Sequence, residues 1–230
     1  MNHYICTGGC GGVSEVSGVC RSEICPLHGK PLVPCDCIDG KHYGKQTAHH
    51  KKVLLLVAQK GFQSKEYFDT KYELEHAGIA VVTVAPRGEE AVSHMGDGVM
   101  PDLALSEVKL SDYNGVFAIG GPGALEYLDN EETTRIYKEA QMMGDYPYCA
   151  ICISPRILAK AGVLTGKRAT GWDGDGKLQD IFDRYGVVRV KESVVADGII
   201  VTADGPAAAH DFGKKIVEII LLRTLKTLKS

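Results

Sequence analysis

The chain has 230 residues, 44% of them hydrophobic, and a formal net charge of −3. A chain of this size and composition can bury one substantial core and a small appendage, which excludes a disordered or repetitive protein. The slight acidic excess disfavours a nucleic-acid surface, because phosphate binding relies on clustered lysine and arginine.

Cysteine is distributed unevenly, since six of the eight cysteines lie before residue 40. This first segment is poor in large apolar residues and cannot build a core without a covalent or metal staple. Disulfides would serve in a secreted protein. No amino-terminal signal pattern is visible, so we expect a cytoplasmic chain, and that compartment favours a metal. We therefore predict a metal-stapled ribbon over residues 1–38.

The spacing of the cysteines favours zinc. Cys6 and Cys10 are separated by three residues, and Cys20 and Cys25 by four. Two hairpin knuckles of this type can close a tetrahedral site of four thiolates. These four cysteines are the predicted ligands, while disulfides and free thiols remain the alternatives. The reserve ligands are His28, Cys35 and Cys37.

The same segment resembles small heavy-metal-binding ribbons in which YxC is followed by PGxC and then by CxxHGxPLVP. The matching runs here are YIC at residues 4–6, SGVC at 17–20 and CPLHGKPLVP at 25–34, with Ser17 in place of the proline. The resemblance implies a bound metal in this part of the chain.

Residues 39–51 are polar, contain two glycines and show no apolar periodicity, which indicates a linker. Its three histidines can add to a metal site, but we interpret them as solvated side chains; they are His42, His49 and His50. An α/β domain is then predicted over residues 52–230.

Three buried strands of this domain end in residues that carry chemistry. The apolar run 52–58 leads through a loop to a helix with Glu66 in its first turns, and the run 115–119 ends in the glycine-rich loop 120–124. A third apolar strand ends at Cys152 and turns at once into a helix, which predicts a nucleophile elbow. Amides at the start of that helix favour a thiolate. Because the carboxyl ends of parallel strands meet at one crevice, we expect these groups at the same rim.

The remaining pattern alternates between strands and helices. We predict helices over 66–77, 130–142, 178–185 and from 207 onward, and strands over 79–84, 103–108, 187–191 and 199–202, the last two paired with each other. The fold class is therefore α/β, with a doubly wound, mostly parallel sheet in a flavodoxin-like sandwich. The apolar run 216–222 is too short to span a bilayer, so no membrane partner is expected. Cys149 faces away from Cys152 on an extended strand, and we place it in the core.

Four motifs in chain order carry a resemblance to a known family. AQKGFQSKE, AIGGPGA, CAICISP and TADGPAAAHDF resemble the ThiJ/PfpI family of the class I glutamine-amidotransferase-like superfamily, which includes deglycases, PfpI-type intracellular proteases and cofactor-free glyoxalases. The resemblance implies that Cys152 is the nucleophile, that Glu66 is the acid beside its sulfur, and that the amides of Gly121 and Ile153 surround an oxyanion. It also implies a homodimer and no cofactor for catalysis.

Two positions depart from the family pattern. Trp172, the only tryptophan, stands near the position where many members carry a histidine, and we expect it to line the pocket together with Gly120 or to be a core aromatic. Ile153 stands where protease-like members carry a histidine directly after the cysteine. Peptide hydrolysis needs a proton delivered to a poor leaving group, so it loses support.

The leading hypothesis is an enzyme in which Cys152 attacks the carbonyl of a 2-oxoaldehyde, or an adduct that such a metabolite has formed on a protein side chain, while Glu66 shuttles the proton. The alternatives are a redox- or metal-responsive stress protein in which Cys152 is oxidised to sulfinic acid, a chaperone with vestigial chemistry, and a PfpI-type peptidase or amidase. In the plainest interpretation, Cys152 is a small core residue and Glu66 a solvated carboxylate.

Overall fold

The computed structural model describes residues 3–6, 10, 12–23, 25, 27–35 and 51–227, with side chains through residue 222. Several predictions fall outside these residues: most of the linker at 39–51, its histidines His42, His49 and His50, and the reserve ligand Cys37.

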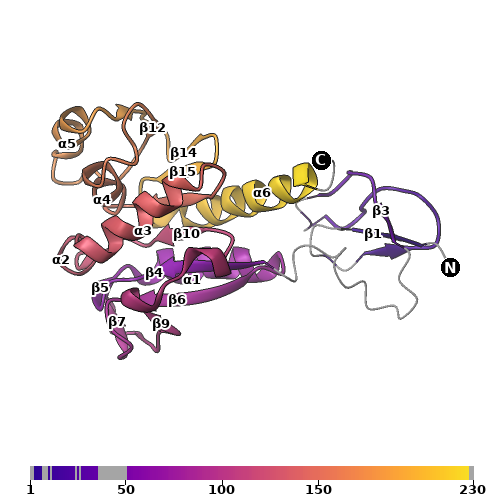
Figure 1. Ribbon diagram of the computed structural model, residues 1–230, viewed down its shortest axis with the longest axis horizontal. Helices are drawn as coiled ribbons and strands as arrows, with labels where there is room; N and C mark the ends of the chain where they lie inside the picture. Colours follow the sequence, from indigo (N-terminus) through magenta and orange to yellow (C-terminus); the bar gives the residue numbers. More distant parts are fainter. Residues whose placement is uncertain are drawn as a thin grey trace.

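A seven-stranded sheet forms the centre of the larger part of the chain (Figure 1). Its strands are β4 (Lys52–Leu56), β6 (Ala80–Ala85), β9 (Leu103–Ala104), β10 (Val116–Ala118), β11 (Tyr148–Ile151), β14 (Val194–Asp197) and β15 (Ile200–Ala203). They lie in the order β14-β15-β11-β10-β4-β6-β9. All neighbours are parallel except β14, which is antiparallel to β15. The predicted mostly parallel sheet is confirmed.

Helices cover both faces of this sheet. They are α1 (Ser64–His76), α2 (Ala124–Tyr127), α3 (Glu131–Met142), α4 (Pro155–Lys160), α5 (Leu178–Arg184) and α6 (Ala209–Thr227). Adjacent residues of a strand face opposite sides, so Leu54 and Leu55 of β4 belong to different layers. Leu55 shares a buried cluster with residues of α1 and α6, whereas Leu54 shares one with residues of α3, α4 and α5. The result is the predicted doubly wound sandwich.

Most predicted elements are present, with ends that differ by one or two residues, but the strand pairing near the carboxyl end was wrong. β13 (Val188–Arg189) pairs with β12 (Arg168–Ala169), and β15 pairs with β14 instead of with the 187–191 segment. Gly198, at φ 64°, turns the chain directly between β14 and β15. Glycine adopts this conformation without strain, so a local hairpin replaces the more distant pairing.

Short elements complete the domain. The strand predicted at 103–108 ends early because the chain continues as a 3-10 helix, η2 (Leu105–Glu107), and two others follow, η3 (Leu110–Asp112) and η4 (Pro206–Ala208). β5 (Lys60–Phe62), β7 (Ala91–Ser93) and β8 (Gly98–Val99) form a small separate sheet that the sequence did not predict. Among the described residues, no helix is long and apolar enough to cross a membrane.

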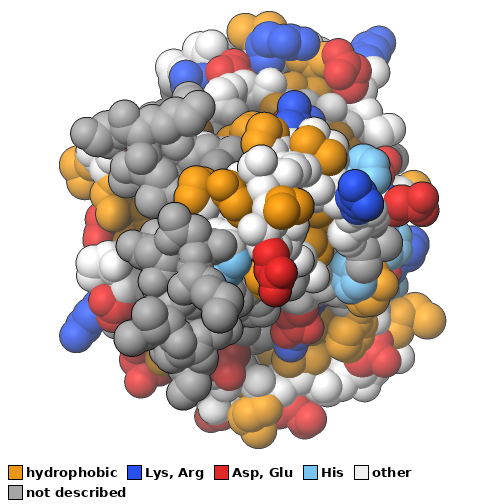
Figure 2. Space-filling model, turned by 90° about the vertical axis from the view of Figure 1, so that its right-hand side faces the viewer, with side chains coloured by type: hydrophobic (Ala, Val, Ile, Leu, Met, Phe, Trp, Pro, Cys, Tyr) orange, Lys and Arg blue, Asp and Glu red, His pale blue; other side chains and the backbone are white. Residues whose placement is uncertain are grey.

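The amino-terminal segment lies at one end of the molecule, beyond the carboxyl-terminal end of α6 (Figure 1). Its strands β1 (His3–Ile5), β2 (Val13–Ser14) and β3 (Val33–Cys35) form an antiparallel sheet in the order β2-β1-β3. The described part of this end carries interspersed acidic, basic and apolar side chains (Figure 2). Three cysteines and Leu27 make up its small buried cluster, so the segment has the weak apolar core expected from its composition.

Candidate active site

Cys152 lies at a strained turn between β11 and α4. Its amide donates a hydrogen bond to Ala203 O (2.8 Å), which continues the sheet up to the cysteine, and α4 begins three residues later at Pro155. Cys152 has φ 65° and is the one non-glycine residue with positive φ in the described part of the chain. Such a conformation costs about 1–3 kcal/mol and persists only where the surroundings fix it. The elbow predicted from the sequence is present.

Glu66 is fully buried in the first turn of α1, so it is not the solvated carboxylate of the alternative interpretation. Its Oε2 accepts a hydrogen bond from the amide of Gly120 (2.9 Å), and its Oε1 is buried without a nitrogen or oxygen partner among the described residues. A Cβ atom at Gly120 would lie 2.5 Å from Cys152 Cβ and 2.9 Å from Glu66 Oε2. Glycine at this position therefore lets the carboxyl group and the cysteine come together.

The glycine-rich loop after β10 packs closely against the loop before α1. The amide of Gln63 donates to Gly120 O (2.9 Å), and Gly121 has φ 113°, a conformation that only glycine adopts readily. Side chains at Gly121 or Gly123 would overlap the backbone of residues 60–63. This close approach sets the position of Gly120 relative to Glu66.

Burial dominates the electrostatics of the cysteine–glutamate pair. It raises the pKa of Glu66 to about 7, while hydrogen bonds with Cys152 and with the Gly120 amide act in the opposite direction. Burial, followed by the charge and hydrogen bond of Glu66, raises the pKa of Cys152 to about 12. The sequence led us to expect that the helix amides would favour a thiolate, but burial of the sulfur and, after it, the neighbouring Glu66 outweigh those amides.

Two amides nevertheless favour negative charge on the sulfur. Hydrogen bonds from the backbone of Gly121 and Ile153 lower the pKa of Cys152 in part. Gly121 and Ile153, the two residues predicted to surround an oxyanion, thus both lie at the sulfur. Gly121 belongs to the loop after β10, and Ile153 directly follows Cys152. Because the carboxyl and thiol interact strongly, they titrate as a pair, and above about pH 7 the pair keeps one proton and one negative charge.

Trp172 lies beside the elbow in the loop after β12. Its amide donates to Cys152 O (2.7 Å), and its side chain is 36% exposed, so it is not a core aromatic. Its carbonyl and ring contact Arg156 of α4, a buried residue to which the sequence gave no role. The sequence could not identify it, because one arginine in an otherwise apolar helix belongs to no recognisable motif or spacing pattern.

Cys149 is fully buried in β11, as predicted, and accepts a hydrogen bond from the Val201 amide (3.3 Å).

The four predicted zinc ligands come together in the amino-terminal segment. The Sγ atoms of these four residues all lie within 4.8 Å of one another; the residues are Cys6, Cys10, Cys20 and Cys25. The Sγ atoms of Cys6 and Cys25 are 3.5 Å apart, as are those of Cys10 and Cys20. These separations are too long for disulfides and close to the edge of about 3.8 Å in a zinc–sulfur tetrahedron with bonds of about 2.3 Å. The four cysteines could therefore hold a metal.

The described reserve ligands lie outside this group. His28 is exposed, and its Nδ1 makes a hydrogen bond with Ser22 O (3.0 Å). Cys35 is buried at the end of β3. Neither belongs to the set of four sulfurs.

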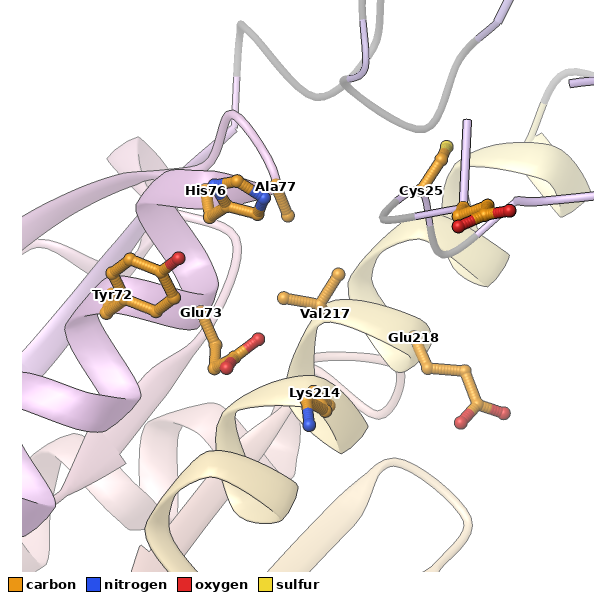
Figure 3. Close-up of a pocket in the computed structure, with 9 residues that line it drawn as sticks. Cys25, Tyr72, Glu73, His76, Ala77, Lys214, Val217 and Glu218 are labelled. Atoms are coloured by element: carbon orange, nitrogen blue, oxygen red, sulfur yellow. The ribbon is translucent and has the colours of Figure 1, made fainter. Parts of the chain in front are cut away.

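A separate cavity of about 530 Å³ lies where the amino-terminal segment meets α1 and α6 (Figure 3). The amino-terminal segment contributes Glu23 and Cys25; the two helices, with the residue that follows α1, contribute Tyr72, Glu73, His76, Ala77, Lys214, Val217 and Glu218. The α1 residues that line it belong to the end of the helix opposite Glu66. The cavity is therefore distinct from the rim that holds Cys152.

Comparison with known proteins matches residues 51–219 to the DJ-1/PfpI family. An uncharacterised protein of Methanocaldococcus jannaschii is 30% identical over 82% of this chain and 92% of its own length. A protein named deglycase from Pyrococcus abyssi is 28% identical over 74% of the chain and 99% of its own length. A protein named glutathione-independent glyoxalase from Caenorhabditis elegans is 24% identical over 75% of the chain and 90% of its own length.

Solved structures agree with this match. A ThiJ/PfpI domain protein from Brachyspira murdochii superposes with a TM-score of 0.69 and 26% identity, covering 75% of this chain and 96% of that one. DJ-1beta from Drosophila melanogaster superposes with a TM-score of 0.66 and 26% identity, covering 77% and 97%. The matched residues contain the four motifs on which the resemblance rested.

Proposed function

The chain belongs to the DJ-1/PfpI family, and from this premise we propose that it is a cysteine-dependent, cofactor-free enzyme acting on electrophilic carbonyls. Its substrates are 2-oxoaldehydes, or the adducts that they form on amines and thiols. The observation that carries the proposal is the buried pair of Glu66 and Cys152 at the strained elbow. The relatives named deglycase and glyoxalase support this class of substrate.

The first step in this proposal is attack by the sulfur. Sγ of Cys152 forms a bond with the aldehyde carbon while the thiol proton passes to the Glu66 carboxylate. The aldehyde oxygen gains negative charge, and the amides of Gly121 and Ile153, which already lie at the sulfur, stabilise it. Glu66 then returns the proton to this oxygen, which gives a hemithioacetal.

The second step moves a proton between two carbons. The Glu66 carboxylate removes the hydrogen of the former aldehyde carbon, which the adjacent ketone acidifies, and delivers a proton to the ketone carbon. The hydroxyl proton of the former aldehyde oxygen moves to the former ketone oxygen, so that the first becomes the thioester carbonyl and the second the 2-hydroxyl group. This produces a thioester of a 2-hydroxy acid. Water then cleaves the thioester and releases the hydroxy acid and the Cys152 thiol. The sum is oxoaldehyde plus water to hydroxy acid, which balances without an external oxidant.

A pKa near neutrality suits Glu66 to this double role, since a base works best when its pKa is close to the working pH. A PfpI-type peptidase or amidase receives less support. Ile153 offers no side chain for protonating an amine leaving group.

We assign the four-cysteine group to structural zinc. Cys6, Cys10, Cys20 and Cys25 offer a closed set of thiolate ligands, which is typical of structural rather than catalytic zinc sites. The metal takes no part in the proposed reaction and supplies folding free energy to a segment with few large apolar residues. A homodimer remains our expectation for the assembly.

The direct test is turnover of methylglyoxal. Wild type is expected to convert it to a 2-hydroxy acid, whereas Cys152→Ala and Glu66→Gln lose this activity while keeping the fold. Equal turnover by wild type and Cys152→Ala would remove the basis of the proposal. Oxidation of Cys152 to sulfinic acid by peroxide in a wild type without turnover would instead favour the redox-responsive alternative.

A further inference from the structure

The described residues contain two fully or nearly fully buried charged side chains, Glu66 and Arg156. Glu66 belongs to the proposed chemistry. Arg156 is 4% exposed and lies four residues after Cys152, on the helix that begins at the elbow. The proposed reaction gives it no role.

Arg156 holds the loop that follows β12. Its Nη1 and Nη2 donate to the two carboxylate oxygens of Asp175 (2.9 and 2.6 Å), and Nη2 also donates to Trp172 O (2.9 Å). Its guanidinium carbon lies 5.4 Å from the centre of the Trp172 ring. Planar, forked hydrogen bonding of this kind fixes both position and orientation, which a lysine could not do.

The same loop holds the backbone of Cys152. The amide of Trp172 donates to Cys152 O (2.7 Å), and a Cβ atom at Gly171 would lie 3.1 Å from that oxygen. The contacts thus form a closed circuit. It runs from Cys152 through the elbow into the first residues of α4, where Arg156 lies, then to Trp172, and back to the carbonyl of Cys152.

Stability alone is a poor reason for burying this arginine. Burying the guanidinium removes its hydration, and an ion pair with a carboxylate that is still 32% exposed, Asp175, recovers little more than that cost. The contacts instead converge on the residue with the strained φ of 65°. Strain of this kind persists only when several contacts define the backbone together.

We propose that Arg156 is a positioning residue for Cys152. Through Trp172 it pins the carbonyl of the cysteine and keeps the sulfur against the amides of Gly121 and Ile153. The role rests on the proposed function only in naming Cys152 as the reactive group.

The test measures alkylation of Cys152, which needs no turnover. Second-order rates with iodoacetamide are followed by peptide mass mapping across pH, and fluorescence of Trp172, the only tryptophan, reports the loop. The variants are Arg156→Met and Arg156→Met/Asp175→Asn; the double variant removes both charges and so leaves no unpaired carboxylate. Lys160→Met is the matched control, because it removes an exposed cation of α4 that pairs with Asp129 (2.8 Å) and not with the Trp172 loop.

We expect both Arg156 variants to be alkylated about 10- to 100-fold more slowly than wild type, with an altered pH profile and a shifted Trp172 emission. Lys160→Met keeps the wild-type values. If Arg156→Met does not fold, the alkylation rate and pH profile of Arg156→Met/Asp175→Asn test the proposal in its place. A wild-type rate and pH profile in a folded Arg156 variant overturns the proposal. If wild type turns over no carbonyl but the alkylation difference persists, the enzymatic proposal fails and the positioning role stands.

Discussion

Replacing Glu66 by glutamine should make the protein more stable and less active at the same pH. Glutamine has the same shape, and its side-chain oxygen can still accept the hydrogen bond from Gly120. It cannot ionise. In the native protein the pKa of Glu66 is raised from 4.5 to about 7, chiefly by burial, so the carboxylate form is disfavoured there relative to the unfolded chain.

The sign of the pH effect follows from this difference. The native state binds the Glu66 proton more tightly than the unfolded state does, so wild-type stability falls as the pH rises from 4.5 through 7. At about 1.4 kcal/mol for each pH unit between the two values, the penalty reaches about 3 kcal/mol above the upper one. The Glu66→Gln variant has no ionisable group at this position, so its stability does not fall for this reason as the pH rises.

Urea unfolding of both proteins under reducing conditions, at pH 4.5, at pH 7 and above, provides the measurement. The free energy of unfolding of Glu66→Gln, minus that of wild type, should grow by about 3 kcal/mol over this range. Glu75→Gln, which changes an exposed carboxylate on the same helix, should show no such growth. Parallel pH profiles for wild type and Glu66→Gln would refute the reasoning.

The same variant should lose about 10²- to 10⁴-fold in turnover of a 2-oxoaldehyde, the usual span for a positioned base. A protein that is destabilised but fully active would contradict both expectations at once.

Three further outcomes are expected. The rate of wild type with a 2-oxoaldehyde should rise through about pH 7 as Glu66 becomes a carboxylate, and an initial-rate profile that is flat across this range would contradict the base role. Gly120→Ala should lower turnover by at least about tenfold, because its Cβ would meet Cys152 Cβ at 2.5 Å and push the pair apart; unchanged kinetics with unchanged melting temperature would show that the rim can adjust. Chelation should unfold the amino-terminal ribbon and leave the α/β domain folded, as followed by circular dichroism with elemental analysis. Protein purified without added metal that contains none, or disulfides among the ribbon cysteines, would refute the zinc assignment.

Much of the rim was predictable because it lies at strand ends. The continuous apolar runs before Glu66 and Cys152 identify parallel strands, and parallel strands bring their carboxyl ends to one edge. The close approach of Gly120 to both groups could be expected from a glycine-rich loop. The elbow at Cys152 followed from an apolar strand running straight into a helix.

Other features depend on contacts that leave no local pattern. The pKa of Cys152 depends on how deeply Glu66 is buried, and burial is set by packing rather than by spacing. Arg156 and Asp175 are separated by nineteen residues, and no periodicity links them. The pairing of β13 with β12 was missed because these strands have two residues each.

The two edges of the central sheet restrict how copies of the chain can associate. At one edge, β9 offers two residues, Leu103 and Ala104, which is too little for a strand from another chain to pair with. At the other edge, β12 lies against β14, and the amide of Arg168 donates to the side chain of Asp197 (2.9 Å). Short and covered edges of this kind protect a sheet from strand addition and aggregation. We therefore expect a homodimer of this protein to be built from helices and loops rather than by adding a strand at β9 or β14.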